Sequence, residues 1–206
     1  PDDQWDQDLD FLLIGDSFVN GACVNRPNDI GSNLRKFNLN GLNLGVVGNG
    51  PLSNLAVLRE YYLQSKNIIF FFYEGNDLKN LKNEINDKYL SNYLIDKNFY
   101  QNLRSKQRII DDMTIERINK ELVKDNKKSE IDYYELILKT LKLYNFRKLI
   151  FGSQEPTFEK IIISIKNFAE LNGSNFYFVY LPDYYTVKTN FKGVDYFRIK
   201  KLLKKL

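Results

Sequence analysis

The stretch Phe11-Leu12-Leu13-Ile14-Gly15-Asp16-Ser17-Phe18 decides the fold of this chain. Its apolar run predicts a strand over residues 8–16 that is buried on both faces, as is typical of the centre of a parallel sheet. A serine stands in the tight turn after this strand, where its hydroxyl is exposed at the strand end. The stretch therefore predicts an α/β fold and a candidate nucleophile, Ser17.

Further strands and helices alternate along the chain. Strands are predicted over residues 42–47, 67–73 and 175–181. Helices are predicted over residues 30–37 with Asp29 as N-cap, from Pro51 to about residue 63, from Pro156 to a terminating Gly173, and over residues 194–206. This alternation predicts a mostly parallel sheet with helices on both faces.

A polar insertion rich in Lys and Asn occupies residues 78–151, after the third predicted strand. It contains two amphipathic helical patterns, one with Ile115, Ile118 and Leu122 and the other with Ile131, Tyr134, Leu138 and Leu141. We interpret it as a helical elaboration or lid of a single domain spanning residues 1–206. A packed surface decoration without function is the simpler alternative.

The composition limits the class of protein. A chain of 206 residues with 43% hydrophobic and 27% charged residues is typical of one globular domain. A net charge of +4 without a nucleic-acid-binding module predicts no nucleic-acid partner. The longest apolar run, residues 68–73, is too short for a membrane span, and the single cysteine excludes an intrachain disulfide. With no histidine and no carboxylates at ligand spacing, we expect no metal or other cofactor.

Three predicted loops belong to one candidate site. Ser17, Gly48 and Asn76 each follow a successive strand, and ligands of parallel sheets bind beyond the carboxyl ends of the strands. Attack of a serine on an ester carbonyl creates an oxyanion, which needs hydrogen-bond donors already in place. The backbone N–H groups of Ser17 and Gly48 and the side-chain amide of Asn76 are the candidate donors.

These loops carry motifs that resemble the SGNH (GDSL-type) hydrolase superfamily. The motifs are Gly15-Asp16-Ser17 followed by Gly21, Asn43-Leu44-Gly45-Val46-Val47-Gly48, and Gly75-Asn76-Asp77. The resemblance covers about residues 10–182 and implies a flavodoxin-like three-layer α/β/α fold. It also implies an ester hydrolase or O-acyl transfer enzyme acting on a small-molecule or glycan acyl ester. Ser17 would be the nucleophile, Ser17 N–H, Gly48 and Asn76 the oxyanion hole, and Asp16 and Asp77 loop-fixing neighbours.

The chain departs from the family pattern in two places. Glu74 stands where the third motif begins with glycine, and we expect it to be a salt-bridged or solvated carboxylate rather than a substitute base. The fourth motif, Asp-x-x-His, which carries the base, is absent. We expect the chain to be a fragment, since it begins at Pro1 and its last predicted helix lacks a terminating Gly or Pro. The final strand and the base would then follow Leu206, and this chain alone would hydrolyse esters very slowly.

Other interpretations remain open at this point. A non-catalytic SGNH-like module could bind a glycan or protein partner through the same edge, and a flavodoxin- or receiver-like domain could hold a phosphate there. Asn76-Asp77 could form an Asx-type cap, and Gly48 and Gly50 a simple turn. For Tyr184, Tyr185 and Tyr196 we expect surface or core packing rather than a substrate cleft. A cell-envelope or periplasmic location would fit if a signal or anchor preceded Pro1.

Overall fold

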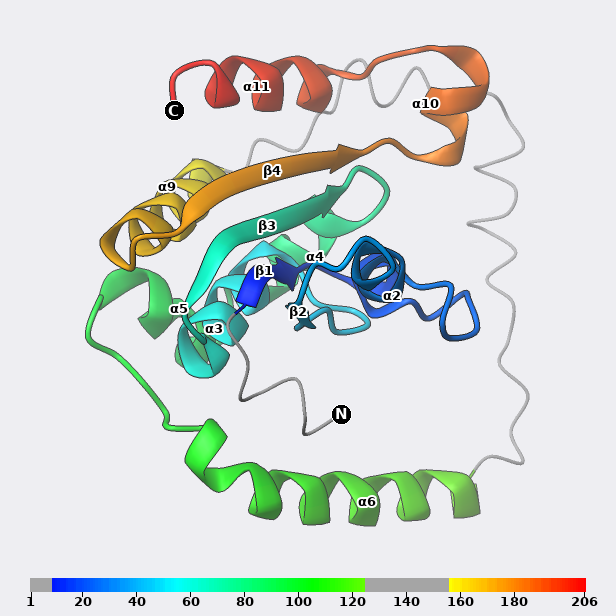
Figure 1. Ribbon diagram of the computed structural model, residues 1–206, viewed down its shortest axis with the longest axis vertical. Helices are drawn as coiled ribbons and strands as arrows, with labels where there is room; N and C mark the ends of the chain where they lie inside the picture. Colours follow the sequence, from blue (N-terminus) through cyan, green and yellow to red (C-terminus); the bar gives the residue numbers. More distant parts are fainter. Residues whose placement is uncertain (1–8, 125–155) are drawn as a thin grey trace.

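The computed structural model of the chain describes residues 9–124 and 156–206 (Figure 1). These residues form an α/β fold around a sheet of four parallel strands in the order β2-β1-β3-β4. The strands are β1 (Leu9–Ile14), β2 (Gly41–Asn43), β3 (Ser65–Tyr73) and β4 (Asn175–Leu181). The predicted parallel sheet is confirmed, and β1 lies inside it as its continuous apolar run indicates.

The helices fall between and after the strands. Those nearest the predicted positions are α2 (Ile30–Arg35), α3 (Pro51–Tyr61), α9 (Pro156–Leu171) and α11 (Val194–Leu203). The others are α1 (Ser17–Asn20), α4 (Asp77–Glu84), α5 (Lys88–Ile95), the 3₁₀ helix η2 (Arg104–Lys106), α6 (Gln107–Lys124) and α10 (Tyr184–Thr189). Within residues 9–124 and 156–206, every helix is too short or too polar to cross a membrane.

Alternate side chains of the central strands enter different hydrophobic clusters on the two faces of the sheet. Leu12 and Phe70 belong to the larger cluster, which includes residues of α3 and α9. Phe11 and Phe71 belong to a smaller cluster with residues of α1 and α2. Because neighbouring side chains of a strand point to opposite faces, each central strand serves both clusters, and helices cover both faces.

Strand β2 is shorter than the predicted range 42–47 because a side-chain turn ends it. The Oδ1 of Asn43 accepts a hydrogen bond from the N–H of Gly45 at 2.9 Å. Such an Asx-type turn competes with the strand ladder. One further ladder contact remains, from the N–H of Leu44 to the carbonyl of Leu13 at 2.9 Å.

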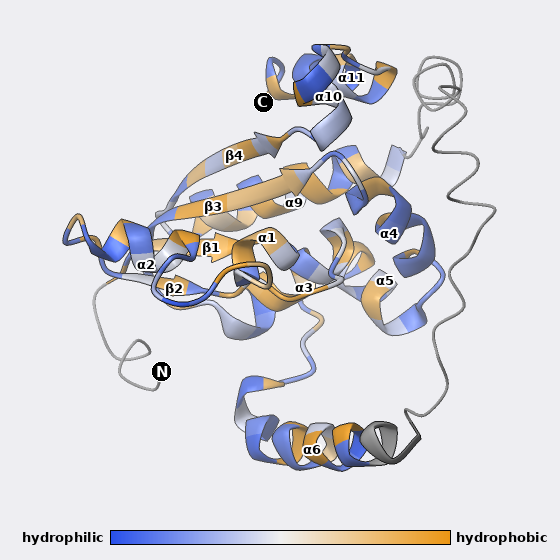
Figure 2. Cartoon of the chain, turned by 90° about the vertical axis from the view of Figure 1, so that its right-hand side faces the viewer, coloured by the Kyte–Doolittle hydropathy of each residue, from blue (hydrophilic) through white to orange (hydrophobic). Residues whose placement is uncertain are grey.

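The predicted insertion divides into two parts. Helices α4 and α5 belong to the body, because Leu81 is 0% and Tyr93 2% exposed. Helix α6 stands apart from the sheet (Figures 1 and 2), and the side chains of Ile115 and Ile118 are exposed. The second predicted helical pattern, which begins at Ile131, lies outside the described residues.

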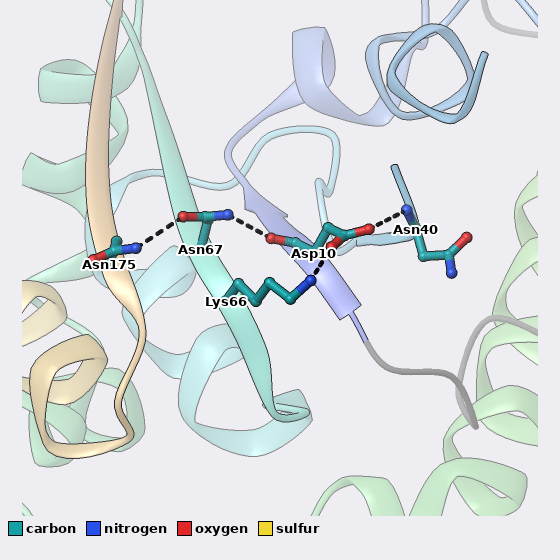
Figure 3. Close-up of polar contacts among 5 residues, drawn as sticks. All are labelled: Asp10, Asn40, Lys66, Asn67 and Asn175. Carbon is teal, nitrogen blue, oxygen red and sulfur yellow. Dashed lines mark hydrogen bonds and ion pairs between the residues drawn. The ribbon is translucent and has the colours of Figure 1, made fainter. Parts of the chain in front are cut away.

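A row of polar contacts joins the strands near their amino ends (Figure 3). Asn175 Nδ2 donates to Asn67 Oδ1 at 3.2 Å, and Asn67 Nδ2 donates to the carbonyl of Asp10 at 2.7 Å. The Asp10 carboxylate pairs with Lys66 at 2.7 Å and accepts the N–H of Asn40 at 2.9 Å. The hydrogen bonds from Lys66 and then Asn40 lower the pKa of Asp10. This edge of the sheet is therefore tied together by its own side chains, opposite the candidate site.

Candidate functional site

The candidate site lies where the carboxyl ends of β2, β1 and β3 meet. The three strands are adjacent and parallel, so the loops that follow them emerge at the same edge of the sheet. Ser17 begins the short helix after β1, Gly48 stands in the loop after β2, and Asn76 precedes α4 after β3. The predicted arrangement of the loops at one edge is therefore present.

Hydrogen bonds join the first two loops directly. The N–H of Val46 donates to the carbonyl of Gly15 at 3.1 Å. The Nδ2 of Asn20 donates to the carbonyl of Gly45 at 3.0 Å. These bonds lie close to Ser17 and Gly48 in sequence, so they limit how far the two loops can separate.

The two elements that flank the third loop, the end of β3 and helix α4, contact the regions of the other two loops. The rings of Phe18 and Tyr73 pack with their centroids 4.5 Å apart, which joins the end of β3 to the region of the first loop. The Nδ2 of Asn80, on α4, donates to the carbonyl of Gly48 at 3.3 Å, which joins α4 to the second loop. The segments around the three candidate residues are thus connected.

Ser17 is the first residue of α1 and is half-buried. Asp16, which is 1% exposed, precedes it as the N-cap and accepts the N–H of Phe18 at 3.0 Å. The Ser17 hydroxyl lies 3.4 Å from Asp16 Oδ2, at the long limit of a hydrogen bond. The N–H of Ser17 belongs to the first turn, where helix geometry provides no acceptor. Helix α1 therefore makes no strong hydrogen bond with either the hydroxyl or the N–H of Ser17.

Position 48 favours glycine because of its backbone conformation, not because neighbouring atoms would collide with a side chain. Its φ is +86°, in the left-handed region, while a Cβ at this position would meet nothing within 4 Å. The N–H of Asn49 donates to the carbonyl of Val46 at 3.2 Å, which closes a turn around Gly48. The interpretation of Gly48 as a turn residue is correct, and the turn leaves it exposed at the edge of the site.

The side chain of Asn76 is not used by the helix that it begins. Asn76 is the N-cap of α4 but makes no side-chain capping bond, so its side chain does not form the Asx-type cap that was the alternative for Asn76-Asp77. Its Oδ1 is buried and has no hydrogen-bond partner among the residues that the structure describes. A buried amide oxygen that the fold leaves without a donor is uncommon in proteins and is a candidate contact for a ligand that donates a hydrogen bond.

The buried side chain of Asp77 holds the third loop by a hydrogen bond to the backbone. It is 0% exposed, and its Oδ2 accepts the N–H of Tyr73 at 2.9 Å. Burial, together with the nearby carboxylates of Asp16 and Glu84, raises the pKa of Asp77 to about 8, against the lowering effect of the Tyr73 N–H. The carboxyl of Asp77 is therefore mostly protonated at pH 7. This removes one negative charge from the candidate site.

Glu74 is held by the end of β4 and the segment that follows it. Its Oε2 accepts the N–H of Asp183 at 3.0 Å, and its own N–H donates to the carbonyl of Leu181 at 2.9 Å. It therefore joins the loop after β3 to the end of β4. One of its carboxylate oxygens thus binds the backbone, in a role that the expected salt bridge or solvated carboxylate did not include.

The loop after β4 carries a helix cap that was not predicted. Asp183 accepts the N–H of Thr186 at 2.7 Å and begins α10. The Asp-x-x-Thr spacing, which is typical of an N-cap, was the available signal. Tyr196 packs on the ring of Tyr180 at 5.4 Å, and Tyr184, which is 66% exposed, packs on Tyr185 at 5.5 Å, as expected for core or surface packing.

The site has no histidine base, because the sequence contains no histidine. The carboxylates of Asp16, Glu74 and Asp77, which belong to the first and third motifs, each accept a backbone N–H. Within the described parts of the chain, no group of three or more His, Cys, Asp or Glu residues could hold a metal ion. The arrangement offers a serine and hydrogen-bond donors.

A cavity of about 620 Å³ adjoins the second loop. Val46, Val57 and Tyr61 form part of its wall, and Arg104 and Asp111 reach it from η2 and α6. Its mixture of apolar and charged groups could accommodate part of a ligand beside the candidate site.

Comparison of the chain with protein-family models, with curated proteins and with solved structures gives no match. The likeness to the SGNH hydrolases therefore rests on three short motifs and their order along the chain. In the structure, the segments that carry these motifs lie at the same edge of the sheet.

Proposed function

We propose that this chain carries the nucleophile and oxyanion hole of an SGNH-type serine ester hydrolase or O-acyl transfer enzyme, built on a flavodoxin-like three-layer α/β/α fold. The observation that carries the proposal is the meeting of the Ser17, Gly48 and Asn76 loops at one sheet edge. The Ser17 oxygen would attack the carbonyl carbon of an acyl ester while its proton passes to a base. The N–H groups of Ser17 and Gly48 and the Nδ2 of Asn76 would bind the oxyanion.

Two details of the site support this role. The amide of Asn76 is left unused by α4, although asparagine is a favoured capping residue. The raised pKa of Asp77 keeps this neighbouring carboxyl mostly neutral at pH 7, so that it does not repel a developing negative charge. Both features suit a site that stabilises an oxyanion.

The base of the reaction is not supplied by a histidine of these 206 residues. In serine hydrolases without their base, the oxyanion hole and substrate binding still give a modest acceleration. We therefore propose slow intrinsic turnover of a small-molecule or glycan acyl ester, and imidazole in solution is a suitable external base.

The missing histidine favours one alternative, a non-catalytic module of the same fold that binds a glycan or protein at this edge. The two functions differ in the reactivity of Ser17. A binding module does not need an activated serine, whereas an ester hydrolase does.

Phosphonylation of Ser17 separates these functions. In imidazole buffer, a fluorophosphonate should form an Oγ–P bond at Ser17 with loss of fluoride, while the hydroxyl proton passes to imidazole. We expect the adduct by peptide mass mapping in the wild type but not in Ser17→Ala, and a rate about 10²-fold lower in Asn76→Ala. Equal labelling of the wild type and Ser17→Ala would instead favour the binding module.

A further inference from the structure

One face of α4 contacts the end of the second loop of the candidate site and the start of α3. Asn76, Asn80 and Glu84 are spaced by four residues, so they lie on the same side of the helix. Asn80 donates to the carbonyl of Gly48, as described above. Glu84 accepts the N–H of Gly50 at 2.6 Å through Oε1 and the N–H of Leu52 at 3.0 Å through Oε2.

Glu84 supplies the cap that α3 lacks. The N-cap residue of α3 is Gly50, which has no side chain to accept a hydrogen bond, and Pro51 follows it. The two carboxylate oxygens of Glu84 take over this function from a different helix. The backbone segment that runs from Gly48 into α3 is therefore held by α4 rather than by its own residues.

Gly50 is needed for this contact. A Cβ at position 50 would lie 2.6 Å from Glu84 Oε2 and 2.9 Å from Asn80 Cβ, which is closer than real contacts allow. The turn interpretation of Gly50 is thus incomplete, because its lack of a side chain also lets α4 approach the loop.

We propose that Asn80 and Glu84 are positioning residues that set the separation between the two oxyanion donors at Gly48 and Asn76. Asn76 begins α4, and a helix is a rigid spacer with a rise of about 1.5 Å per residue. Asn80 and Glu84 bind the second loop at Gly48 and Gly50, so the helix fixes where that loop lies relative to Asn76. This inference rests on the proposed function, since only an oxyanion hole needs such spacing.

The donor separation matters because small displacements are costly in catalysis. A misplacement of about 1 Å can lower a rate about 10²-fold. Loss of either α4 contact should therefore reduce the rate of reaction at Ser17 more than it reduces binding of the reagent.

The test compares phosphonylation kinetics of Asn80→Ala and Glu84→Gln with those of the wild type in imidazole buffer. A matched control is Asn83→Ala, because Asn83 is another asparagine of the same helix. All rates are measured well below the melting temperature of each variant. We expect the rate constant at saturating fluorophosphonate to fall at least about tenfold in both variants. The half-saturating concentration, and both constants of Asn83→Ala, should stay unchanged.

Wild-type kinetics in Asn80→Ala and Glu84→Gln, with lower melting temperatures, would show that the contacts are only structural and would overturn the positioning role. That result leaves Ser17 as the nucleophile. If the wild type reacts no faster than Ser17→Ala, the proposed function itself is wrong, and the positioning role fails with it. Asn80→Ala keeps the Glu84 cap of α3, so the test does not depend on the folding of Glu84→Gln.

Discussion

Arg59 and Glu60, adjacent residues near the end of α3, bind the same loop, Arg59 as a hydrogen-bond donor and Glu60 as an acceptor. Arg59 donates to the carbonyls of Tyr93 at 2.6 Å, Asp96 at 3.1 Å, Phe99 at 2.9 Å and Lys97. Glu60 accepts the hydroxyl of Tyr93 at 2.5 Å and the N–H groups of Gln101 at 2.6 Å and Leu103 at 2.7 Å. These two buried charges hold the segment that leads from α5 to α6 against the body.

Replacement of Arg59 by alanine should destabilise the fold strongly. The arginine is 7% exposed, and its removal takes away four hydrogen bonds to backbone carbonyls, of which the one to Tyr93 is buried. We expect a loss of about 3 kcal/mol in the free energy of unfolding. For a chain of this size, that corresponds to a melting temperature lower by roughly 6–12 °C.

The matched control is Arg198→Ala. The side chain of Arg198 is 46% exposed and lies 3.8 Å from Asp195, so the change should alter stability by less than about 0.5 kcal/mol. Equal effects of the two substitutions, measured by thermal unfolding, would contradict the role assigned to Arg59.

The pH dependence of stability should report the protonation of Asp77. In the unfolded chain this carboxyl ionises with the ordinary aspartate pKa of 3.8, whereas in the folded protein its pKa is about 8. The folded state binds the extra proton between these values, so its stability should fall as the pH rises from about 4 to 8. The Asp77→Asn variant cannot ionise and should not show this loss of stability. The side-chain oxygen of the new asparagine can still accept the N–H of Tyr73.

We compare the melting temperature of Asp77→Asn with that of the wild type at each pH. The difference, variant minus wild type, should increase by at least about 3 °C between pH 4 and pH 8. Thermal unfolding followed by circular dichroism at several pH values measures this difference. A difference that stays constant over the range would mean that Asp77 is ionised in the folded protein at neutral pH.

Glu74→Gln should leave the reactivity of Ser17 nearly unchanged. Glutamine has the size of glutamate and can still accept the N–H of Asp183 through its side-chain oxygen, but it cannot act as a base. We expect phosphonylation of Ser17 within about twofold of the wild-type rate in imidazole buffer. A tenfold or larger fall would identify Glu74 as a substitute base.

Much of the fold could be predicted because local signals mark the element ends. Asp29 caps α2 through the N–H of Ser32 at 2.9 Å, Pro51 begins α3, and β4 has the predicted bounds. Helices α4 and α5 escaped prediction since each has eight residues and few buried apolar side chains, such as Leu81 and Tyr93. So short a segment shows no clear helical periodicity.

The meeting of the candidate loops could also be predicted, because it follows from parallel strands. The contacts that support these loops could not. Glu84 is 34 residues from Gly50 and 32 from Leu52, and nothing in a short polar helix indicates which distant N–H groups it binds. Arg59 and Glu60 likewise resemble solvated charges in the sequence, and only the tertiary structure shows that they are buried.

A crystal structure of the phosphonylated chain would measure the oxyanion site itself. With phosphorus bound to Ser17 Oγ, the phosphoryl oxygen occupies the position of the oxyanion. We predict that it lies about 2.7–3.1 Å from both the backbone nitrogen of Gly48 and the Nδ2 of Asn76. A phosphoryl oxygen directed into solvent, with neither nitrogen within hydrogen-bond distance, would contradict the proposed site.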